Sequence, residues 1–221
     1  MLIDKRKLLV TGCARSGTLY ASRLWQALGL DIRHERPVPP DGQMGRDGIA
    51  SWFMAVKDPN PPYGPSALHY QFDFIIHQVR DPLKVIASVA QFIISANKSG
   101  KQYIIANCPE ANLSEQQQNL KPHEQWILQA ALYWHHWNLI AERIASITVS
   151  LENLPNSLPA LCEMLEVNYS PGVIDGIPQD TNARKLYIKA TPWVINWQYL
   201  ETLNPALTEI IRDQASRYGY L

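Results

Sequence analysis

The chain has 221 residues and is 46% hydrophobic, enough for one α/β domain with a substantial core, and we expect a single domain over residues 1–221. Its 20 basic and 20 acidic residues balance, which argues against nucleic acid or an anionic membrane surface as a partner. The three cysteines are scattered without metal-ligand spacing, so we expect a reducing compartment, no disulfide framework and no metal site. No apolar run is long enough for a signal peptide or a membrane span, which favours a soluble, cytoplasmic protein.

A strand, a glycine loop and a helix are predicted between residues 7 and 22. Leu8–Val10 form a short apolar run, typical of a strand buried on both faces of a parallel sheet. Gly12 breaks this run, and apolar residues return at helical spacing after Thr18. The N–H groups and the dipole at a helix start attract anions, so this loop is a predicted phosphate-binding site. Cys13 lies in it, and a small residue offering its backbone N–H is favoured over a reactive thiol.

The loop matches only the first part of the nucleotide-binding motif G-x-x-x-x-G-K-[ST]. Gly12 and Gly17 have the required spacing, but Thr18 replaces the lysine and Leu19 replaces the hydroxyl that binds magnesium. These replacements argue against a metal-assisted ATP or GTP hydrolase. Arg15 lies inside the loop, where its guanidinium can bind two anionic oxygens without a metal. The alternative is an ordinary glycine turn between a strand and a helix.

A second strand is predicted at residues 31–35, and its carboxyl end carries His34 and Glu35. Ligands of an open parallel sheet bind beyond the carboxyl ends of the strands, so these side chains are expected to face the crevice of the Gly12 loop. Either side chain can accept a proton from an attacking hydroxyl. A hydrogen-bonded strand-end histidine beside a solvated glutamate is an equally good interpretation.

The remaining pattern alternates strands and helices, which is typical of a three-layer α/β fold with a central, mainly parallel sheet. The predicted elements are a helix at 48–56 capped by Asp47, a short strand at 68–70, a strand at 72–79, a helix from Pro82 to Ile93 capped by Asp81, a helix at 123–144, a strand at 147–151, and helices at 157–165 and 203–218. Residues 97–122 are polar and weakly periodic, which indicates a lid, an acceptor-binding segment or a disordered one.

Trp126, Ala130, Trp134 and Trp137 fall along one stripe of the helix predicted at 123–144. An aromatic stripe can stack on a sugar or phenolic acceptor. Core packing is the favoured interpretation, because tryptophans at this spacing usually face the sheet.

Arg80 follows the strand at 72–79 and precedes a helix, so it lies at a second strand-to-helix junction on the same edge of the sheet as the Gly12 loop. Ser88 lies about two turns along that helix. Two anion sites are therefore expected to share one crevice. Without a ligand, Arg80 would be a surface arginine and Ser88 a packed helix serine.

Two motifs resemble those of the sulfotransferases that use 3′-phosphoadenosine 5′-phosphosulfate (PAPS). CARSGT resembles their 5′-phosphosulfate loop x-P-[KR]-S-G-T, and RDPLKVIAS resembles their 3′-phosphate signature, R-[DN]-P followed by a serine. The two occur in the family order. Ala14 stands in place of the frequent proline, and Arg15 in place of the lysine of many cytosolic members, whereas other branches have arginine. Glu152-Asn153-Leu154 resembles a tripeptide of bacterial and tyrosylprotein members.

The resemblance implies a P-loop, sulfotransferase-like fold with PAPS as donor, 3′-phosphoadenosine 5′-phosphate (PAP) as product, and no metal. It implies that Arg15, Ser16, Gly17 and Thr18 hold the 5′-phosphosulfate, in a loop completed by Cys13 and Ala14, and that Arg80 and Ser88 hold the 3′-phosphate. A basic segment with Asn182, Arg184 and Lys185 loosely matches the one that closes over the 3′-phosphate in the family.

The expected activity is transfer of a sulfuryl group to a hydroxyl or amine of a small-molecule or glycan acceptor. Arg15 would stabilise the developing charge, and Glu35 or His34 would deprotonate the acceptor. His69 and His77 are alternative bases. A non-catalytic nucleotide-binding module and, less favoured, a small-molecule kinase are the rival interpretations.

Overall fold

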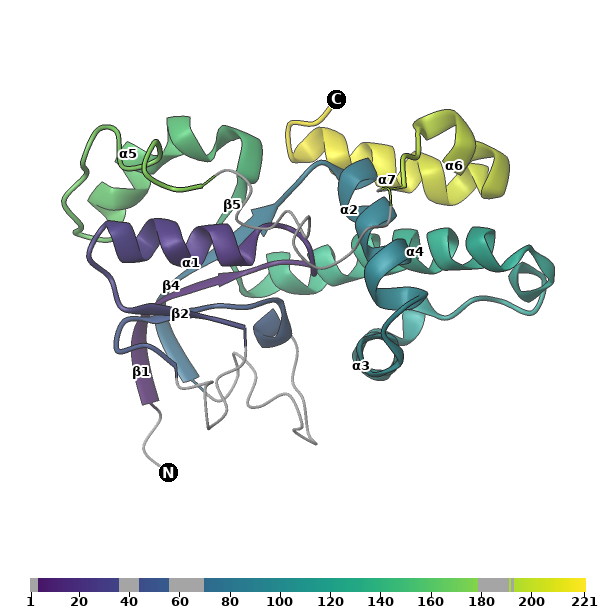
Figure 1. The fold of residues 1–221 in the computed structure, drawn as a ribbon, viewed down its shortest axis with the longest axis horizontal. Coiled ribbons are helices and arrows are strands. Elements are labelled where there is room, and N and C mark those ends of the chain that lie inside the picture. The colour runs from purple at the N-terminus through teal and green to yellow at the C-terminus, as the bar shows by residue number, and fades with distance from the viewer. Residues whose placement is uncertain (1–3, 36–43, 56–69, 179–190, 192) are drawn as a thin grey trace.

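The central sheet is parallel throughout its five described strands. The structure, a computed structural model, describes residues 4–35, 44–55, 70–178, 191 and 193–221 (Figure 1). The strands are β1 (Asp4–Thr11), β2 (Ile32–His34), β3 (Gly48–Ala50), β4 (Tyr70–Val79) and β5 (Ile147–Ser150), in the spatial order β2-β3-β1-β4-β5. Leu8, Leu9 and Val10 are fully buried at the centre of the sheet, as a strand covered on both faces requires.

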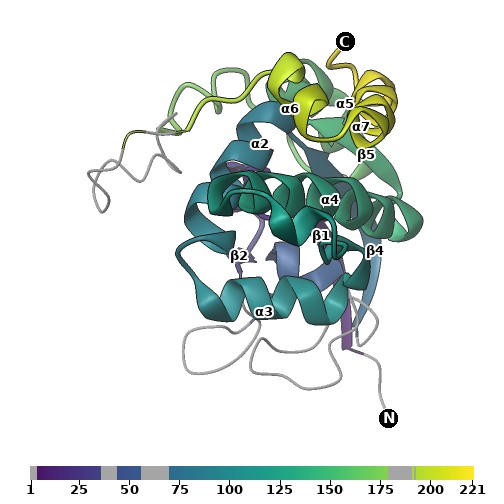
Figure 2. The ribbon, with the colours of Figure 1, turned by 90° about the vertical axis from the view of Figure 1, so that its right-hand side faces the viewer.

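Helices cover both faces of the sheet (Figures 1 and 2). On one face α1 (Thr18–Ala27) and α5 (Leu154–Met164) pack over the side chains of Leu8 and Val10. On the other face lie α2 (Pro82–Val89), α3 (Lys98–Asn107), α4 (Pro122–Ile144), α6 (Trp197–Leu203) and α7 (Pro205–Arg217). The expected three-layer α/β architecture is confirmed.

The carboxyl ends of β1 and β4 form the switch point of the sheet. After β1 the chain passes through α1 to β2, at one edge of the sheet. After β4 it passes through α2, α3 and α4 to β5, at the opposite edge. The two strands are direct neighbours, with Thr11 paired to His77 near their ends. Chain connections diverge at this point, and ligands of open α/β sheets bind beyond the strand ends at such a point.

The helix predicted at 48–56 is wrong, because this stretch begins with the strand β3. Ile49 and Ala50 are fully buried, and β3 pairs with β1 on one side and β2 on the other. Only a strand can supply backbone partners to both neighbours. Asp47 does not cap a helix, since its carboxylate accepts the N–H of Asp31 over 2.7 Å. A 3₁₀ turn, Trp52–Ala55, follows.

Disorder of residues 97–122 is also contradicted, because the segment folds and packs. Asn97 caps α3 by accepting the N–H of Gly100 over 2.9 Å, and Ile104 of this helix is fully buried. Two 3₁₀ turns, Pro109–Ala111 and Gln117–Asn119, lead to α4. The apolar face of α3 is too narrow to give a helical pattern in the sequence.

The other differences concern element bounds. β4 begins at Tyr70, α2 passes at Val89 into a π-helical turn at Ala90–Ile94, and β5 ends at Ser150. The helix expected at 203–218 is α7, which starts two residues later and is capped by Asn204. The helix α6, which precedes it, is not among the predicted elements. Asp81 caps α2 as predicted. Residues 68 and 69 lie outside the described residues.

Core packing is confirmed for most of the aromatic stripe of α4. Ala130, Trp134 and Trp137 are fully buried. Trp126 is partly buried and stacks on Trp193, with ring centroids 6.1 Å apart and ring planes 17° apart. Within the described ranges, none of the helices combines the length and the apolar character that a membrane span requires.

Candidate functional site

The glycine loop after β1 packs directly against the backbone at the end of β4. A Cβ atom on Gly12 would lie 2.2 Å from the carbonyl oxygen of Gln78, so only glycine fits there. Gly17 has φ of 97°, and a Cβ on it would lie 2.9 Å from both Gln78 Nε2 and Leu151 Cδ2. The two glycines therefore let the ends of β1, β4 and β5 converge beneath the loop.

The loop leads directly into the start of α1. Gly17 is the N-cap residue, no side chain among the described residues caps this end, and the first turn has no acidic residue. The first N–H groups of a helix lack intrahelical acceptors and carry partial positive charge. The start of α1 therefore has the character of an anion site.

Several groups of the loop turn inward. The Ser16 hydroxyl donates to the Cys13 carbonyl over 2.8 Å, and the Ala14 N–H donates to the hydroxyl oxygen of Tyr133 over 2.7 Å. Burial raises the pKa of the Cys13 thiol to about 12, so Cys13 stays protonated and is not a nucleophile. Of residues 12–18, all of which the structure describes, only Arg15 is partly exposed.

Arg15 joins the two predicted anion-binding segments. Its Nε donates to the Ser88 hydroxyl over 2.8 Å, and the Arg80 guanidinium approaches the Arg15 carbonyl oxygen at 3.4 Å. The Arg15 guanidinium carbon also lies 5.9 Å from the ring centroid of Phe92. The structure thus brings Arg15, Arg80 and Ser88 together at the switch point.

Arg15 itself has an unusual backbone conformation. Its φ is 73°, in the left-handed region that few residues other than glycine adopt. Strained conformations of this kind persist only where the surrounding structure determines them, and they concentrate at functional sites.

The start of α2 differs from that of α1, because a side chain caps it. One carboxylate oxygen of Asp81 accepts the N–H groups of Leu83 at 2.9 Å and Lys84 at 3.3 Å. The other oxygen lies 3.4 Å from Lys84 Nζ. An anion near this helix therefore relies on the side chains of Arg80 and Ser88, not on the helix start.

Comparison with models of known protein families gave no match, and comparison with curated proteins gave none either. The function is therefore argued from the site itself.

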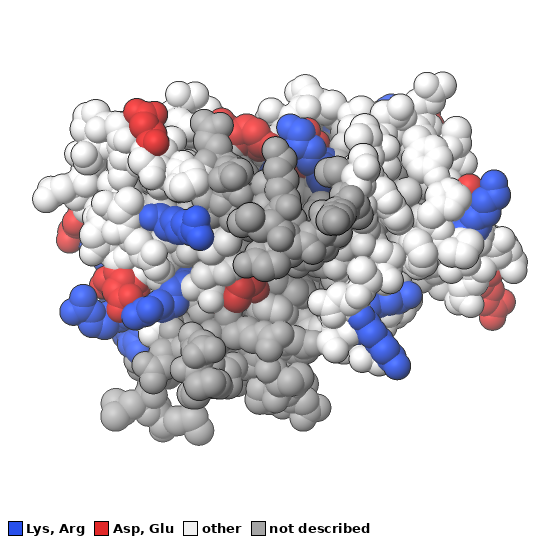
Figure 3. All heavy atoms as spheres, viewed as in Figure 1, with Lys and Arg blue, Asp and Glu red and all other residues white. Residues whose placement is uncertain are grey.

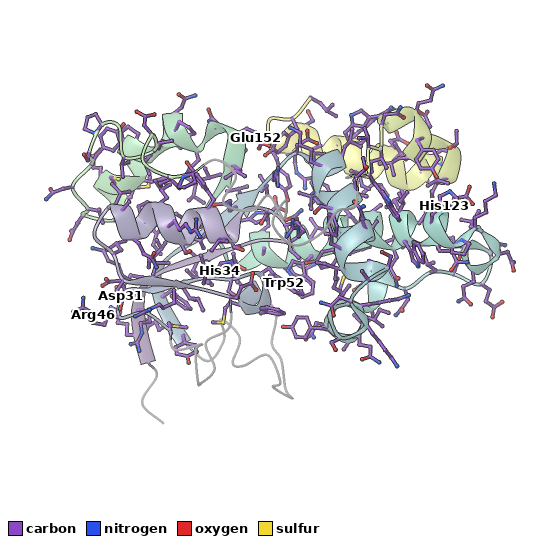
Figure 4. All side chains as sticks on the ribbon, in the orientation of Figure 1. Asp31, His34, Arg46, Trp52, His123 and Glu152 are labelled. Atoms are coloured by element: carbon purple, nitrogen blue, oxygen red, sulfur yellow. The ribbon has the colours of Figure 1, made fainter. Side chains whose placement is uncertain are left out.

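His34 and Glu35 lie beside the first residue of α1. His34 Nε2 is 3.1 Å from Thr18 Oγ1 and 3.1 Å from Glu35 Oε1. With a hydrogen on Nε2, the ring donates to both oxygens, which leaves the Glu35 carboxylate as the proton acceptor of the group. Glu35 has φ of 68°, a second strained residue at the site. His34 and Trp52 lie at the same end of the β2 and β3 side, whereas Asp31 and Arg46 lie at the other end (Figure 4).

His77 is a core residue and not a candidate base. It is fully buried, and its ring nitrogens lie 3.1 Å from Thr148 Oγ1 and 3.0 Å from Asn138 Oδ1. Burial lowers the pKa of His77 to about 4, against 6.5 in water. His69 lies outside the described residues, and so do Asn182, Arg184 and Lys185 of the basic segment predicted near the second anion site.

A cavity of about 380 Å³ lies at the end of β5 and is lined in part by Asp81, the N-cap residue of α2. Asp81, Lys84, Ser150, Glu152 and Tyr220 line part of it, and the Tyr220 hydroxyl donates to Glu152 over 2.5 Å. Burial raises the pKa of Tyr220 above its usual value. Two carboxylates and one ammonium give the cavity a net negative lining, which does not suit a phosphate. Glu152 lies well apart from His34 (Figure 4).

The charged surface gives no further candidate. On the face shown in Figure 3, basic and acidic side chains are interspersed instead of forming a patch of one sign. The described residues contain no group of three or more His, Cys, Asp or Glu side chains placed to hold a metal ion.

Sequence reasoning missed two residues that fasten the loop. Gln78 is buried and donates from Nε2 to the Ser16 carbonyl over 2.7 Å, and Tyr133 accepts the Ala14 N–H. Gln78 is a polar residue next to the end of a buried strand, which is unusual and could have indicated a role at the site. The sequence contains no such signal for Tyr133, because it lies on the aromatic face of a helix, where core packing is a sufficient reason for a tyrosine.

Proposed function

We propose that the chain is a PAPS-dependent sulfotransferase. The observation that carries this proposal is the joining of Arg15, Ser88 and Arg80 above the ends of β1 and β4. These residues belong to the two motifs that resemble the family, and they are far apart in the sequence. A nucleotide with phosphates at both ends of its ribose needs two neighbouring cationic sites, and a P-loop alone has one.

The loop and the α1 start suit the 5′ end of the nucleotide, and Arg80 with Ser88 suits the 3′-phosphate. The α1 start carries no side-chain cap and no acidic residue in its first turn, so its N–H groups can bind a sulfuryl or phosphoryl oxygen. The Ser88 hydroxyl accepts from Arg15, and its own hydrogen can be donated to a phosphate oxygen. Arg80 adds the charge that the capped α2 start lacks.

The donor supplies an activated sulfuryl group whose leaving group is the 5′-phosphate of PAP. Arg15 and the loop N–H groups would neutralise the charge that develops on the bridging oxygen as its bond to sulfur breaks. Glu35 would take the proton from the acceptor hydroxyl or amine as the new bond to sulfur forms. His34 would hold that carboxylate in place through Nε2. Arg80 and Ser88 would act remotely, through binding energy that positions the donor.

Calorimetry with PAP tests the assignment of the two anion sites. Arg15→Ala and Arg80→Ala should each weaken PAP binding by about 10- to 100-fold, the range for losing a charged hydrogen bond. ATP should bind poorly to the wild type, because it has no 3′-phosphate. Arg212→Ala is the control, since Arg212 lies on α7 and pairs with Glu201. Equal PAP affinity in the wild type and in both site variants would overturn the proposal.

An acceptor screen separates the proposal from its rivals. The wild type should release PAP from PAPS in the presence of one member of a panel of sugars, phenols and lipids. Tight PAP binding without transfer to any member would instead favour a non-catalytic nucleotide-binding module. Magnesium-dependent turnover of ATP would favour a kinase, against which the replacement of the P-loop lysine and hydroxyl by Thr18 and Leu19 argues.

A further inference from the structure

The glycine loop is fastened at three consecutive residues by side chains from elsewhere in the chain. Tyr133 of α4 accepts the N–H of Ala14, and Arg80 approaches the carbonyl of Arg15. Gln78 of β4 donates to the carbonyl of Ser16. Arg15, the residue with φ of 73°, lies at the centre of this set.

The contact from Tyr133 is short and is shielded from water. The donor and acceptor atoms are 2.7 Å apart, Tyr133 is fully buried and Ala14 is 1% exposed. The phenol ring is held between Trp137, with ring centroids 5.0 Å apart, and Trp52, at 6.3 Å. Burial keeps the pKa of Tyr133 well above 10, so the phenol stays neutral and keeps its place as an acceptor.

A buried N–H needs an acceptor, and Tyr133 is the acceptor in this fold. Loss of the Tyr133 hydroxyl would therefore leave the N–H of Ala14, which is 1% exposed, without the acceptor that it has here, unless the loop moved.

We propose that Tyr133 is a positioning residue of the anion loop, which holds the Ala14 N–H so that Arg15 keeps the left-handed conformation that directs its guanidinium to Ser88. The proposal rests on the proposed function only for its ligand, PAP. Its structural part is independent, because the contact between Tyr133 and Ala14 is measurable without a nucleotide.

Tyr133→Phe tests the proposal. It leaves the Ala14 N–H without the acceptor that it has in this fold and should weaken PAP binding by about tenfold, because the loop shifts to satisfy the donor. Hydrogen exchange of the Ala14 amide should also become about tenfold faster, and this measurement needs no nucleotide.

Tyr103→Phe is the matched control, since it removes another buried phenol hydroxyl from the same aromatic cluster. The Tyr103 hydroxyl donates to the Phe53 carbonyl over 3.2 Å. Tyr103→Phe should lower the free energy of unfolding yet leave PAP affinity unchanged. The comparison of Tyr133→Phe with Tyr103→Phe decides the question, because each variant loses one buried phenol hydroxyl.

Two results would overturn the proposal. One is a loss of PAP affinity in Tyr133→Phe no larger than in Tyr103→Phe. The other is an Ala14 amide that exchanges no faster in Tyr133→Phe than in Tyr103→Phe. If the wild type does not bind PAP, the proposed function fails first, and exchange of the Ala14 amide still tests the contact with Tyr133.

Discussion

The Nε atom of Arg15 lies 2.8 Å from the hydroxyl oxygen of Ser88, although the two residues are 73 positions apart in the chain. Arg15 belongs to the loop after β1, and Ser88 to the helix after β4. The hydrogen bond exists because β1 and β4 are neighbours in the sheet, whose connections then leave in opposite directions. The residues of the two predicted anion sites therefore form one contiguous group with Arg15 at its centre.

The shared position of Arg15 predicts that its effect on binding depends on Ser88. Ser88→Ala should weaken PAP binding by about three- to tenfold, because it removes both a donor and the acceptor that orients Arg15. Combining Ser88→Ala with Arg15→Ala should cost less than the sum of the two single effects, since the variants share one hydrogen bond. Calorimetric titration of the three variants with PAP measures this coupling.

Ser95→Ala is a suitable comparison, because Ser95 follows the π-helical turn after α2 and its hydroxyl donates to the Gln91 carbonyl. It should leave PAP affinity unchanged. Strict additivity of the Arg15 and Ser88 effects would mean that the 2.8 Å contact has no part in ligand binding.

The group of Thr18, His34 and Glu35 predicts a variant that loses turnover but keeps binding. Glu35→Gln keeps the shape of the side chain and removes its basicity, so turnover of PAPS should fall by about 100-fold or more, as expected for loss of a general base. PAP affinity should stay within about twofold, because Glu35 contacts His34 and not the cationic side chains. Steady-state kinetics with the acceptor found by the screen, together with calorimetry, provide both values.

Glu163→Gln, on the exposed side of α5, controls for a nonspecific effect of losing one carboxylate. Unchanged turnover in Glu35→Gln would move the general base to another residue. A parallel loss of PAP affinity would instead place Glu35 in the donor site.

The buried His77 predicts how stability depends on pH. Its pKa is lowered from 6.5 to about 4 in the folded chain, chiefly by burial. Above pH 6.5 the ring is neutral in both states, whereas between pH 6.5 and 4 only the unfolded chain takes up the proton. The folded state should therefore lose stability as the pH falls through this window, by on the order of 3 kcal/mol from this residue.

Urea unfolding of the wild type and of His77→Gln at several pH values between 7 and 4 checks this effect. His77→Gln should be less stable at neutral pH, since it disturbs the contacts to Thr148 and Asn138, but its loss of stability toward acid should be shallower. His123→Gln, at an exposed position, should follow the wild type. Identical slopes for the wild type and His77→Gln would contradict the assignment.

The sequence predicted the parts of the site that depend on local patterning. The strand, loop and helix around Gly12 and Gly17 follow from glycine spacing and apolar periodicity, and the capping of α2 by Asp81 from helix-start chemistry. The position of His34 at the end of a strand also follows from such a pattern, and the structure places it beside Thr18.

Features that depend on long-range packing could not be read in this way. Gly48–Ala50 is a strand because β1 and β2 lie on either side of it. A segment of three residues is too short for its sequence to show which strands will pair with it. The contacts of Gln78 and Tyr133 with the loop join segments more than 60 residues apart. The capping of α2 by Asp81 could be predicted from the sequence. Its consequence, that an anion there must be bound by side chains instead of by the helix start, becomes visible only when the structure shows Arg80 beside the loop.

The starts of α1 and α2 differ in what they offer a ligand, because a side chain caps only the start of α2. At the start of α1 no described side chain caps the N–H groups, so these and the helix dipole can attract an anion. At the start of α2 the Asp81 carboxylate accepts the N–H of Leu83 and repels further negative charge. An anion at the α1 start can therefore be bound by backbone N–H groups, which a side-chain substitution does not remove. An anion at the α2 end depends on the side chains of Arg80 and Ser88, so single substitutions can abolish that half of the site while the other half stays in place.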